Sequence, residues 1–306
     1  MPSEFELIKK YFDRPAPGAV LGVGDDAALI RPGEGMQLAV STDLLLEGRH
    51  FSPGAEPRKL GHKALAVNLS DLAAMGAAPR WATLALGLPS ADEAWLAGFA
   101  AGFFALAGRY GVALVGGDTT RAPAAGPLTV CVTIFGEVPA GLALLRGGAR
   151  PGDDIWVSGE LGGAALALAQ PGNAAAARRL HEPEPRIELG HRLRGVASAA
   201  IDVSDGFAQD LGHILERSGV GAEVDYERLP RFSGAQAAQV LNGGDDYELV
   251  FTAKQVRRAE IEALAQPLGL ALARVGSIRA GDPKLLVRDK DRAPMAVGRG
   301  FDHFAA

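Results

Sequence analysis

Cysteine is nearly absent from the chain, and its single copy, Cys131, lies inside the apolar run LTVCVTIFG. One cysteine excludes a disulfide framework and a thiolate-rich metal site, and we expect this residue to be a small buried core residue. An excess of positive charge is also missing, because the formal net charge is −5 and the isoelectric point is about 5.7. An acidic chain of this kind gives no indication of a basic surface that would bind nucleic acid or an anionic membrane.

Hydrophobic runs typical of a signal peptide or a membrane span are absent as well. The N-terminal stretch MPSEFELIKKYF has no apolar core and predicts an amphipathic helix in which Ser3 and Glu6 form a capping box. The most apolar helical stretch, AWLAGFAAGFFALAGRYG, contains glycines and has charged residues at its flanks, which favours a buried helix. We therefore expect a cytoplasmic protein.

Several common catalytic signatures cannot be found. The chain has no G-x-x-x-x-G-K-[ST] loop, no H-R-D with D-F-G set and no G-x-S-x-G elbow. The stretch GVGDDA matches a dinucleotide-binding fingerprint only formally, because two carboxylates in the first turn of a helix would repel an unscreened pyrophosphate. The six histidines are scattered, and only His50 follows a predicted strand closely enough to suggest that it faces a ligand.

Strands and helices alternate along the sequence, which predicts an α/β protein with mixed sheets. A chain of 306 residues, 48% of them hydrophobic, is long enough for two domains that each have a core. We expect one helix to begin at Pro57 and end at Gly76, and the next to be capped by Ser90 with Glu93 and to stop at Gly111. The stretch GARPGDD at 148–154 predicts a boundary between domains 1–147 and 148–306.

Aspartates recur where apolar strands end beside glycine, serine or threonine. They are Asp25, Asp26, Asp43, Asp118, Asp202, Asp205, Asp245 and Asp246, and Asp71 shares a helix face with Asn68. Loops at strand ends place ligands in α/β proteins, although any single aspartate could instead cap a helix or a turn. Many carboxylates with few histidines indicate hard oxygen ligation, which suits Mg²⁺ or Mn²⁺ rather than Zn²⁺. Such a metal would let carboxylates and glycine-rich turns serve the same polyphosphate.

Taken together, these motifs resemble the thiamine-monophosphate kinase family. The resemblance rests on GVGDDAAL, STDLLLEGRHF, KALAVNLSDLAAMGAAP, GGDTT, GGARPGD, IDVSDGFAQDLGHI, GGDDYELVF and GFDHF, which occur in this order from about residue 3 to residue 304. The family belongs to the superfamily of aminoimidazole ribonucleotide synthetase, selenophosphate synthetase and a hydrogenase maturation protein.

The resemblance implies an ATP-dependent transfer of the γ-phosphoryl group to thiamine monophosphate, directly and in line. It also implies an aminoimidazole ribonucleotide synthetase-like fold. In that fold the sheet of an N-terminal α/β domain pairs with its twofold mate in a homodimer, and ATP and several Mg²⁺ ions lie between this domain and the C-terminal one. The attacking oxygen of a phosphate monoester is already ionised at pH 7, so we expect no general base among the catalytic residues.

The resemblance assigns three groups of residues. The implied metal ligands are Asp26, Ser41, Thr42, Asp43, Asp71, Asp118, Asp202 and Asp205. The implied ATP contacts are Gly117, Asp118, Arg146, Ser204 and Tyr110, and the implied acceptor contacts are His50, Asp245 and Phe301. Two of these depart from the family pattern, because Asp245 stands where GGEDYEL has glutamate and Phe301 where GYDHF has tyrosine. A cationic thiazolium ring is compatible with an acidic and an aromatic neighbour.

Other functions remain open at this point. A second ATP-dependent enzyme of the superfamily, of the purine-precursor ligase or carbamoyl dehydratase type, would share the nucleotide motifs and differ in its acceptor. A nucleotide- or Mg²⁺-binding regulatory protein would bind ATP without forming ADP. The aspartates could also serve only as caps on a two-domain scaffold, which the consistent order of the motifs disfavours.

Overall fold

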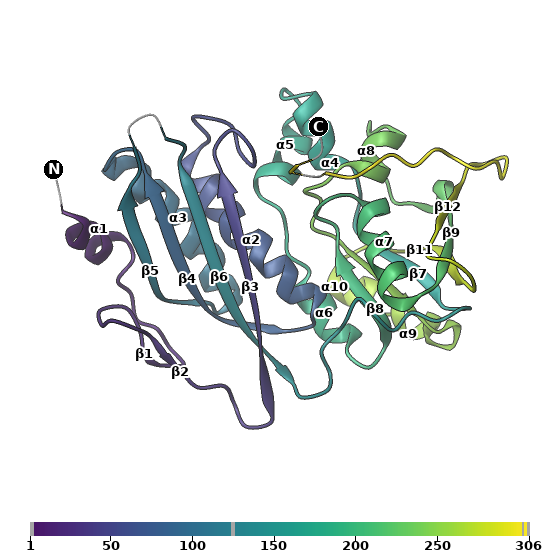
Figure 1. Cartoon of the computed structure of the whole chain (residues 1–306), viewed down its shortest axis with the longest axis horizontal. Helices are drawn as coiled ribbons and strands as arrows, with labels where there is room; N and C mark the ends of the chain where they lie inside the picture. The colour runs from purple at the N-terminus through teal and green to yellow at the C-terminus, as the bar shows by residue number, and fades with distance from the viewer. Residues whose placement is uncertain (1–2, 124–125, 302, 305–306) are drawn as a thin grey trace. The chain divides into compact units, whose positions relative to one another are not determined.

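The computed structural model describes residues 3–123, 126–301 and 303–304 (Figure 1). Its helices and strands fall into two compact units, one formed by Met1–Leu72 with Ala77–Ala140 and the other by Ala73–Gly76 with Gly141–Ala306. Both units combine helices with a mixed sheet, so the predicted α/β class with mixed sheets is confirmed.

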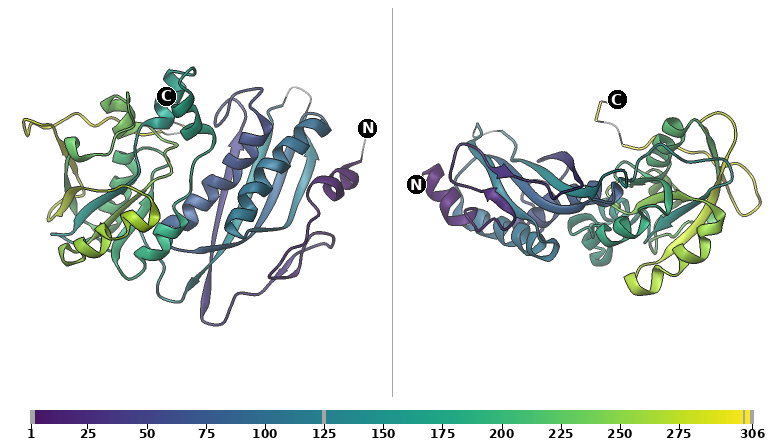
Figure 2. Two further views of the ribbon diagram at one scale, coloured as in Figure 1. Left: turned by 180° about the vertical axis from the view of Figure 1, so that it is seen from behind. Right: turned by 90° about the horizontal axis from the view of Figure 1, so that it is seen from below.

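The first unit is built on a four-stranded sheet with helices on one face. The strands, in spatial order, are β3 (Met36–Leu46), β6 (Thr129–Pro139), β4 (Ala78–Leu88) and β5 (Ala113–Arg121). Only β4 and β5 run parallel. The helices α2 (Pro57–Ala74) and α3 (Glu93–Tyr110) cover the face turned toward the viewer in the left panel of Figure 2, whereas no helix covers the face seen in Figure 1. Smaller elements at the β5 side are α1 (Glu4–Tyr11), β1 (Ala19–Leu21) and β2 (Leu29–Ile30).

The side chains of β6 alternate between these two faces. Val130, Val132 and Ile134 are almost fully buried under the helices, and Cys131 lies between them in sequence and therefore on the opposite face. Cys131 is only half-buried, so the prediction of a core cysteine was wrong. The same helix-free face exposes apolar side chains of β3, with Val40 57% and Leu44 54% exposed.

The N-terminal caps of the first unit follow the sequence only in part. Ser3 and Glu6 form the predicted capping box of α1. The prediction that Ser90 caps α3 was wrong, because the carboxylate of Asp92 accepts hydrogen bonds from the N–H groups of Ala94 and Trp95 at 2.9 and 3.1 Å. Helix α3 ends at Gly111, as predicted, which adopts a φ of 67°.

Helix α3 is buried through its aromatic and aliphatic side chains. Leu96, Phe99 and Phe103 are fully buried in the first unit, as expected for the most apolar helix of the sequence. Among the residues that the structure describes, no helix combines the length and the hydropathy needed to cross a bilayer.

The second unit is built on a six-stranded sheet. Its strands, in spatial order, are β12 (Leu285–Arg288), β9 (Gly221–Asp225), β11 (Leu272–Arg279), β7 (Asp154–Ser158), β10 (Leu249–Ala253) and β8 (Ala197–Asp202). Only β12 and β9 run parallel. The core lies between one sheet face and α7 (Phe207–Ser218), which contributes Phe207, Leu211 and Ile214. The other helices are α4 (Gly163–Ala169), α5 (Ala174–His181), α6 (Ile187–Leu193), α8 (Ala237–Asn242), α9 (Arg258–Glu262) and α10 (Ala265–Leu268), with 3-10 turns at Tyr226–Arg228 and Gln255–Arg257.

Replacing the cap of α3 should destabilise the first unit. We expect Asp92→Ala to lower the free energy of unfolding by about 1 kcal/mol, because two N–H groups of the first helical turn lose their acceptor. Urea denaturation measures this difference, and Ser90→Ala is the matched control that should leave stability unchanged. A larger loss for Ser90→Ala than for Asp92→Ala would contradict the assignment.

Candidate functional site

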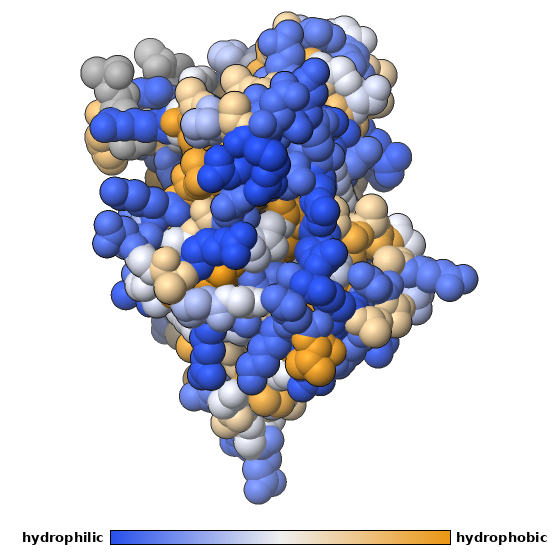
Figure 3. Space-filling view, turned by 90° about the vertical axis from the view of Figure 1, so that its right-hand side faces the viewer, coloured by the Kyte–Doolittle hydropathy of each residue, from blue (hydrophilic) through white to orange (hydrophobic). Residues whose placement is uncertain are grey.

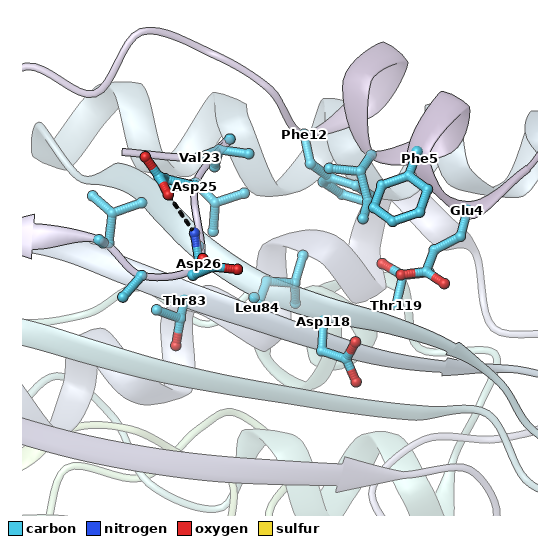
Figure 4. A pocket seen from close by; sticks show the side chains of 18 residues that line it. Glu4, Phe5, Phe12, Val23, Asp25, Asp26, Thr83, Leu84, Asp118 and Thr119 are labelled. Atoms are coloured by element: carbon cyan, nitrogen blue, oxygen red, sulfur yellow. Dashed lines mark hydrogen bonds between the residues drawn. The ribbon is translucent and has the colours of Figure 1, made fainter. Parts of the chain in front are cut away.

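A pocket of about 630 Å³ lies at the edge strand of the first unit's sheet. Residues 114–119 of β5 form its floor, the loop 23–28 lies at one end, and side chains of α1 lie at the other (Figure 4). Asp26, Gly117 and Asp118 all line this pocket, so the structure brings three of the predicted site residues together.

Different local interactions fix the acidic residues and the glycine of this pocket. The N–H of Asp26 donates to Oδ1 of Asp25 at 2.9 Å, which stabilises the loop. In Figure 4 the Asp118 side chain projects to the side of the strands opposite Leu84. A Cβ atom at Gly117 would lie 1.8 Å from the carbonyl oxygen of Leu84, so the close approach of β4 to β5 requires glycine there.

A second group of predicted residues lies at the other edge of the same sheet, on β3 and α2. The hydroxyl of Ser41 donates to Oδ2 of Asp71 at 2.5 Å, and Asp43 is on the same face of β3 as Ser41. Thr42 points to the opposite face, where its hydroxyl shares a 2.8 Å hydrogen bond with that of Thr133. The sequence STD therefore supplies side chains to both faces of the sheet.

Asn68 provides a further oxygen beside this second group. It is fully buried on α2, one turn before Asp71, and its Nδ2 donates to the carbonyl of Ala64 at 3.0 Å. Its Oδ1 is buried and has no hydrogen-bond partner among the residues that the structure describes. A buried carbonyl oxygen left without a donor is satisfied by a bound cation or by water, so the environment fits an oxygen-ligated metal.

The sheet itself separates the two acidic groups of the first unit. The register places Asp118 beside Ala85 on β4, Ala85 beside Cys131 on β6, and Cys131 beside Leu44 on β3. Three strand spacings amount to about 14 Å between the backbones at the two edges. Within the described ranges, no three or more His, Cys, Asp or Glu side chains are grouped closely enough to hold a metal ion.

Three predicted residues lie apart from these groups. Nδ1 of His50 accepts a hydrogen bond from the N–H of Leu46 at 3.0 Å, which fixes the imidazole in the segment after β3. Tyr110 is at the end of α3, where the Arg109 guanidinium lies 5.1 Å from its ring centroid, and it does not line the pocket. Arg146 has an exposed side chain in the second unit, and its carbonyl accepts from Ser218 Oγ at 3.4 Å.

In the second unit, a buried carboxylate organises the loop that follows β8. Oδ2 of Asp210 accepts hydrogen bonds from the N–H groups of Ser204, Asp205 and Gly206 at 3.0–3.1 Å. Burial, followed by the negative charges of Asp202 and Asp205, raises the pKa of Asp210 to about 8. Asp210 is not among the predicted site residues, although its place as an acid in the first turn of the helix after SDG is a signal in the sequence.

Two of the three predicted acceptor residues, Asp245 and Phe301, meet at this same loop. The N–H of Asp245 donates to the carbonyl of Ser204 at 2.9 Å, and the N–H of Phe301 donates to that of Asp205 at 3.0 Å. Gln209 Nε2 also donates to the carbonyl of Phe301 at 3.0 Å. Ser204, Asp205, Asp245 and Phe301 are therefore neighbours, while Asp302 of the GFDHF motif lies outside the described residues.

The backbone around Asp245 is held in an unusual conformation. Asp245 and Tyr247 have φ values of 63° and 50°, which are rare for residues other than glycine, above all for a bulky aromatic one. The hydroxyl of Tyr247 donates to Oδ1 of Asp245 at 2.8 Å and so fixes the carboxylate. Strained residues of this kind concentrate at functional sites.

Two buried acids support this segment from beneath. Glu248 is fully buried and accepts hydrogen bonds from Ser158, Arg179 and Arg186 at 2.5–2.8 Å. Oδ2 of Asp246 accepts from the N–H of Gly162 at 2.7 Å, whereas its Oδ1 is buried and finds no partner within the described part of the chain. Burial is the largest cause that raises the pKa of Asp246, to about 7, and the Gly162 N–H opposes it.

This raised pKa predicts a pH-dependent stability. Because the folded-state pKa of Asp246 lies above its value in the unfolded chain, its protonation stabilises the fold fully below about pH 4, and that contribution is lost as the pH rises through about 7. Asp246→Asn keeps an acceptor for Gly162 but cannot titrate. Between pH 5 and pH 8 the free energy of unfolding, measured by urea denaturation, should fall more for the wild type than for the variant. An equal fall in the two proteins would contradict the prediction. Asp210 titrates in both proteins, so its contribution cancels when the two pH dependences are subtracted.

The two units match two family models. Residues 24–138 match the AIR synthase related protein, N-terminal domain, and residues 150–288 match the AIR synthase related protein, C-terminal domain. The thiamine-monophosphate kinase of Salmonella typhimurium (strain LT2) is 44% identical in an alignment 324 positions long that covers 99% of this chain and 98% of the relative.

Two solved structures show the same similarity in three dimensions. Thiamine-monophosphate kinase from Stenotrophomonas maltophilia K279a is 46% identical with a TM-score of 0.83, and the match covers 92% of this chain and 94% of that one. A structure described as AaThiL complexed with AMPPCP and TMP is 30% identical with a TM-score of 0.77, and its match covers 98% of this chain and 96% of that one. The similarity therefore extends over both units.

Proposed function

Because the chain belongs to the thiamine-monophosphate kinase family, we propose that it transfers the γ-phosphoryl group of ATP to thiamine monophosphate and forms thiamine diphosphate. The observation that carries this function is 44% identity to such a kinase over 99% of the chain. The relative solved with AMPPCP, a non-hydrolysable ATP analogue, and with TMP supports both substrates. We propose the cytoplasm as the location of this ATP-dependent reaction.

Several Mg²⁺ ions would be held by oxygen donors from both units. The proposed ligands are Asp26, Ser41, Thr42, Asp43, Asp71 and Asp118 of the first unit, and Asp202 and Asp205 of the second. The chemistry of this set fits Mg²⁺, which prefers carboxylate and other hard oxygen ligands, and the unpartnered Oδ1 of Asn68 lies one turn from Asp71. Bound Mg²⁺ would neutralise the charge of the phosphates that react.

For the nucleotide, we propose contacts with Gly117, Asp118, Arg146, Ser204 and Tyr110. The edge pocket supports the first two, because Gly117 and Asp118 line it together with the apolar side chains of Phe5, Ile8 and Phe12. An apolar wall beside polar groups is the usual design of a small-molecule site. Residues 1–147 would then form the ATP- and Mg²⁺-binding and dimerisation domain, and residues 148–306 would complete the ATP and substrate site.

For the acceptor, we propose contacts with His50, Asp245 and Phe301. The carboxylate of Asp245, held by the Tyr247 hydroxyl, and the aromatic face of Phe301 would bind the cationic thiazolium ring. The attacking phosphate oxygen is ionised at neutral pH, so these residues orient the acceptor and no side chain has to remove a proton. Asp245 is one methylene shorter than glutamate, and the hydrogen bond from the Tyr247 hydroxyl would fix the position of its carboxylate relative to the acceptor.

The homodimer would bring together acids that one sheet keeps apart. Asp118 and Asp43 lie on opposite edge strands of the same sheet, separated by β4 and β6. Two carboxylates that share a magnesium cluster must lie within a few ångströms of each other. The exposed Val40 and Leu44 on the helix-free face suit burial against a second copy. We therefore assign Asp118 of one protomer and Asp43 of its partner to the same site.

Mixed dimers test both the metal ligands and the shared site. Homodimers of Asp43→Asn or of Asp118→Asn should each lose at least about a hundredfold in the rate of thiamine diphosphate formation, because a lost ligand weakens metal binding. Co-expression of the two variants with different tags gives dimers with one intact site and about half the wild-type rate, since a twofold dimer holds two equivalent sites.

The reciprocal dimer is the control for this experiment. A double variant, Asp43→Asn with Asp118→Asn, paired with a wild-type chain should be inactive, because each site then lacks one ligand. Half activity of this control, with no activity of the first mixed dimer, would place both aspartates in a site within one chain. Full activity of both single variants would remove the proposed metal site altogether.

A further inference from the structure

A groove of about 240 Å³ lies on the second unit's sheet, and its lining includes none of the residues assigned to ATP or thiamine monophosphate. The register places Asp154 of β7, Ser277 of β11 and Glu223 of β9 in one row across three neighbouring strands. The adjacent row, with Ile155 and Val224, belongs to the core beneath α7. Side chains of a strand alternate between faces, so the row with Asp154 and Glu223 forms the opposite face.

Arginines from several elements surround these carboxylates. Arg258 of α9 donates to both oxygens of Asp154 at 2.6 and 2.8 Å, and Arg274 Nη1 lies 3.7 Å from Oδ1 of the same carboxylate. Glu223 accepts from Arg288 Nε at 3.1 Å and from Arg292.

Two more arginines complete the ring of positive charge. Arg279 Nη2 lies 3.9 Å from Glu223, and Arg228 Nε lies 3.3 Å from Asp225. The contact of Arg279 is long, as is that of Arg274 on the same strand. Neither guanidinium is therefore committed to a close hydrogen bond with the acids below.

Charge and burial are distributed unevenly in this groove. Five arginines line the groove and a sixth, Arg288, pairs with Glu223 beside it, against three carboxylates, whereas the whole chain has a net charge of −5. The carboxylates lie underneath, with the Asp154 side chain 4% exposed, and the guanidinium groups lie above, with Arg279 59% exposed. Figure 3 views the side of the molecule on which β9 and β12 lie and shows many strongly hydrophilic side chains there. The buried acids hold the arginines in place without neutralising all of them.

We propose that this arginine groove binds a small anion that contains a diphosphate group. A guanidinium has five N–H donors in a planar fork that matches phosphate oxygens, so arginines held by one carboxylate still have donors for a ligand. A groove of about 240 Å³ accommodates a diphosphate group, and the rest of an organic ligand would extend outside it. Free pyrophosphate and the diphosphate of an organic molecule share this chemistry. The proposal does not depend on the proposed reaction.

Calorimetric titration of the full-length protein with pyrophosphate tests the groove. The titration is done in EDTA without Mg²⁺, so that metal-dependent binding at the proposed active site does not contribute. Arg274→Gln with Arg279→Gln is the test variant, because these arginines make only long contacts and their loss leaves Asp154 and Glu223 paired with Arg258 and Arg288. We expect the dissociation constant to rise at least about tenfold, since each lost charge-assisted contact weakens binding.

A control variant and titrations with other ligands show whether binding is specific to the groove. Arg178→Gln with Arg192→Gln removes the same charge from exposed positions on α5 and α6 and should bind pyrophosphate like the wild type. Titration with ADP and thiamine diphosphate shows whether an organic diphosphate binds better than the free ion. No binding to the wild type, equal binding of sulfate, or equal weakening in both variants would overturn the proposal. Undiminished binding by Asp118→Asn shows that the groove acts independently of the proposed active site.

Discussion

Electrostatic repulsion between the two substrates is the constraint on which the proposed site depends. ATP and thiamine monophosphate both present ionised phosphates, and transfer requires one phosphate to approach the other. Carboxylates alone would add to this repulsion, so their number at strand ends makes sense only with cations between protein and substrate. Asp26 and Asp118 lie at one edge of the first unit's sheet and Asp43 and Asp71 at the other, and in the proposed homodimer a second copy would unite them across the rigid ladder between those edges.

In the second unit, backbone hydrogen bonds hold the proposed site residues in position. Asp210 is buried beneath the loop that contains Ser204 and Asp205 and receives three of its N–H groups. The loop in turn holds Asp245 and Phe301 through its carbonyl oxygens. Glu248 and Asp246 support the strained turn at Asp245 and Tyr247 from the interior. A displacement of any of these buried groups would therefore move acidic and aromatic side chains at once.

Local chemistry made part of the structure predictable. The capping box of Ser3 and Glu6 and the end of α3 at Gly111 depend on neighbouring residues only, and both were confirmed. The cap of α3 was misassigned because Ser90 and Asp92 are both good caps, and only the folded chain shows that Asp92 directly precedes the helix. The run around Cys131 contains apolar residues for both sheet faces, and the sequence does not tell that one face has no helices. Asp210 could have been found from its place in the first turn of the helix after SDG, because its hydrogen bonds are local, whereas the positive φ of Tyr247 has no signal in the sequence.

Acceptor-dependent release of ADP tests the central claim most directly. Purified protein with ATP and Mg²⁺ should release ADP when thiamine monophosphate is present, in step with the appearance of thiamine diphosphate, and EDTA should abolish both. Free thiamine, which lacks the ionised phosphate, should give no release. Equal release with free thiamine would contradict the assignment of the acceptor site. No release with thiamine monophosphate would contradict the proposed reaction.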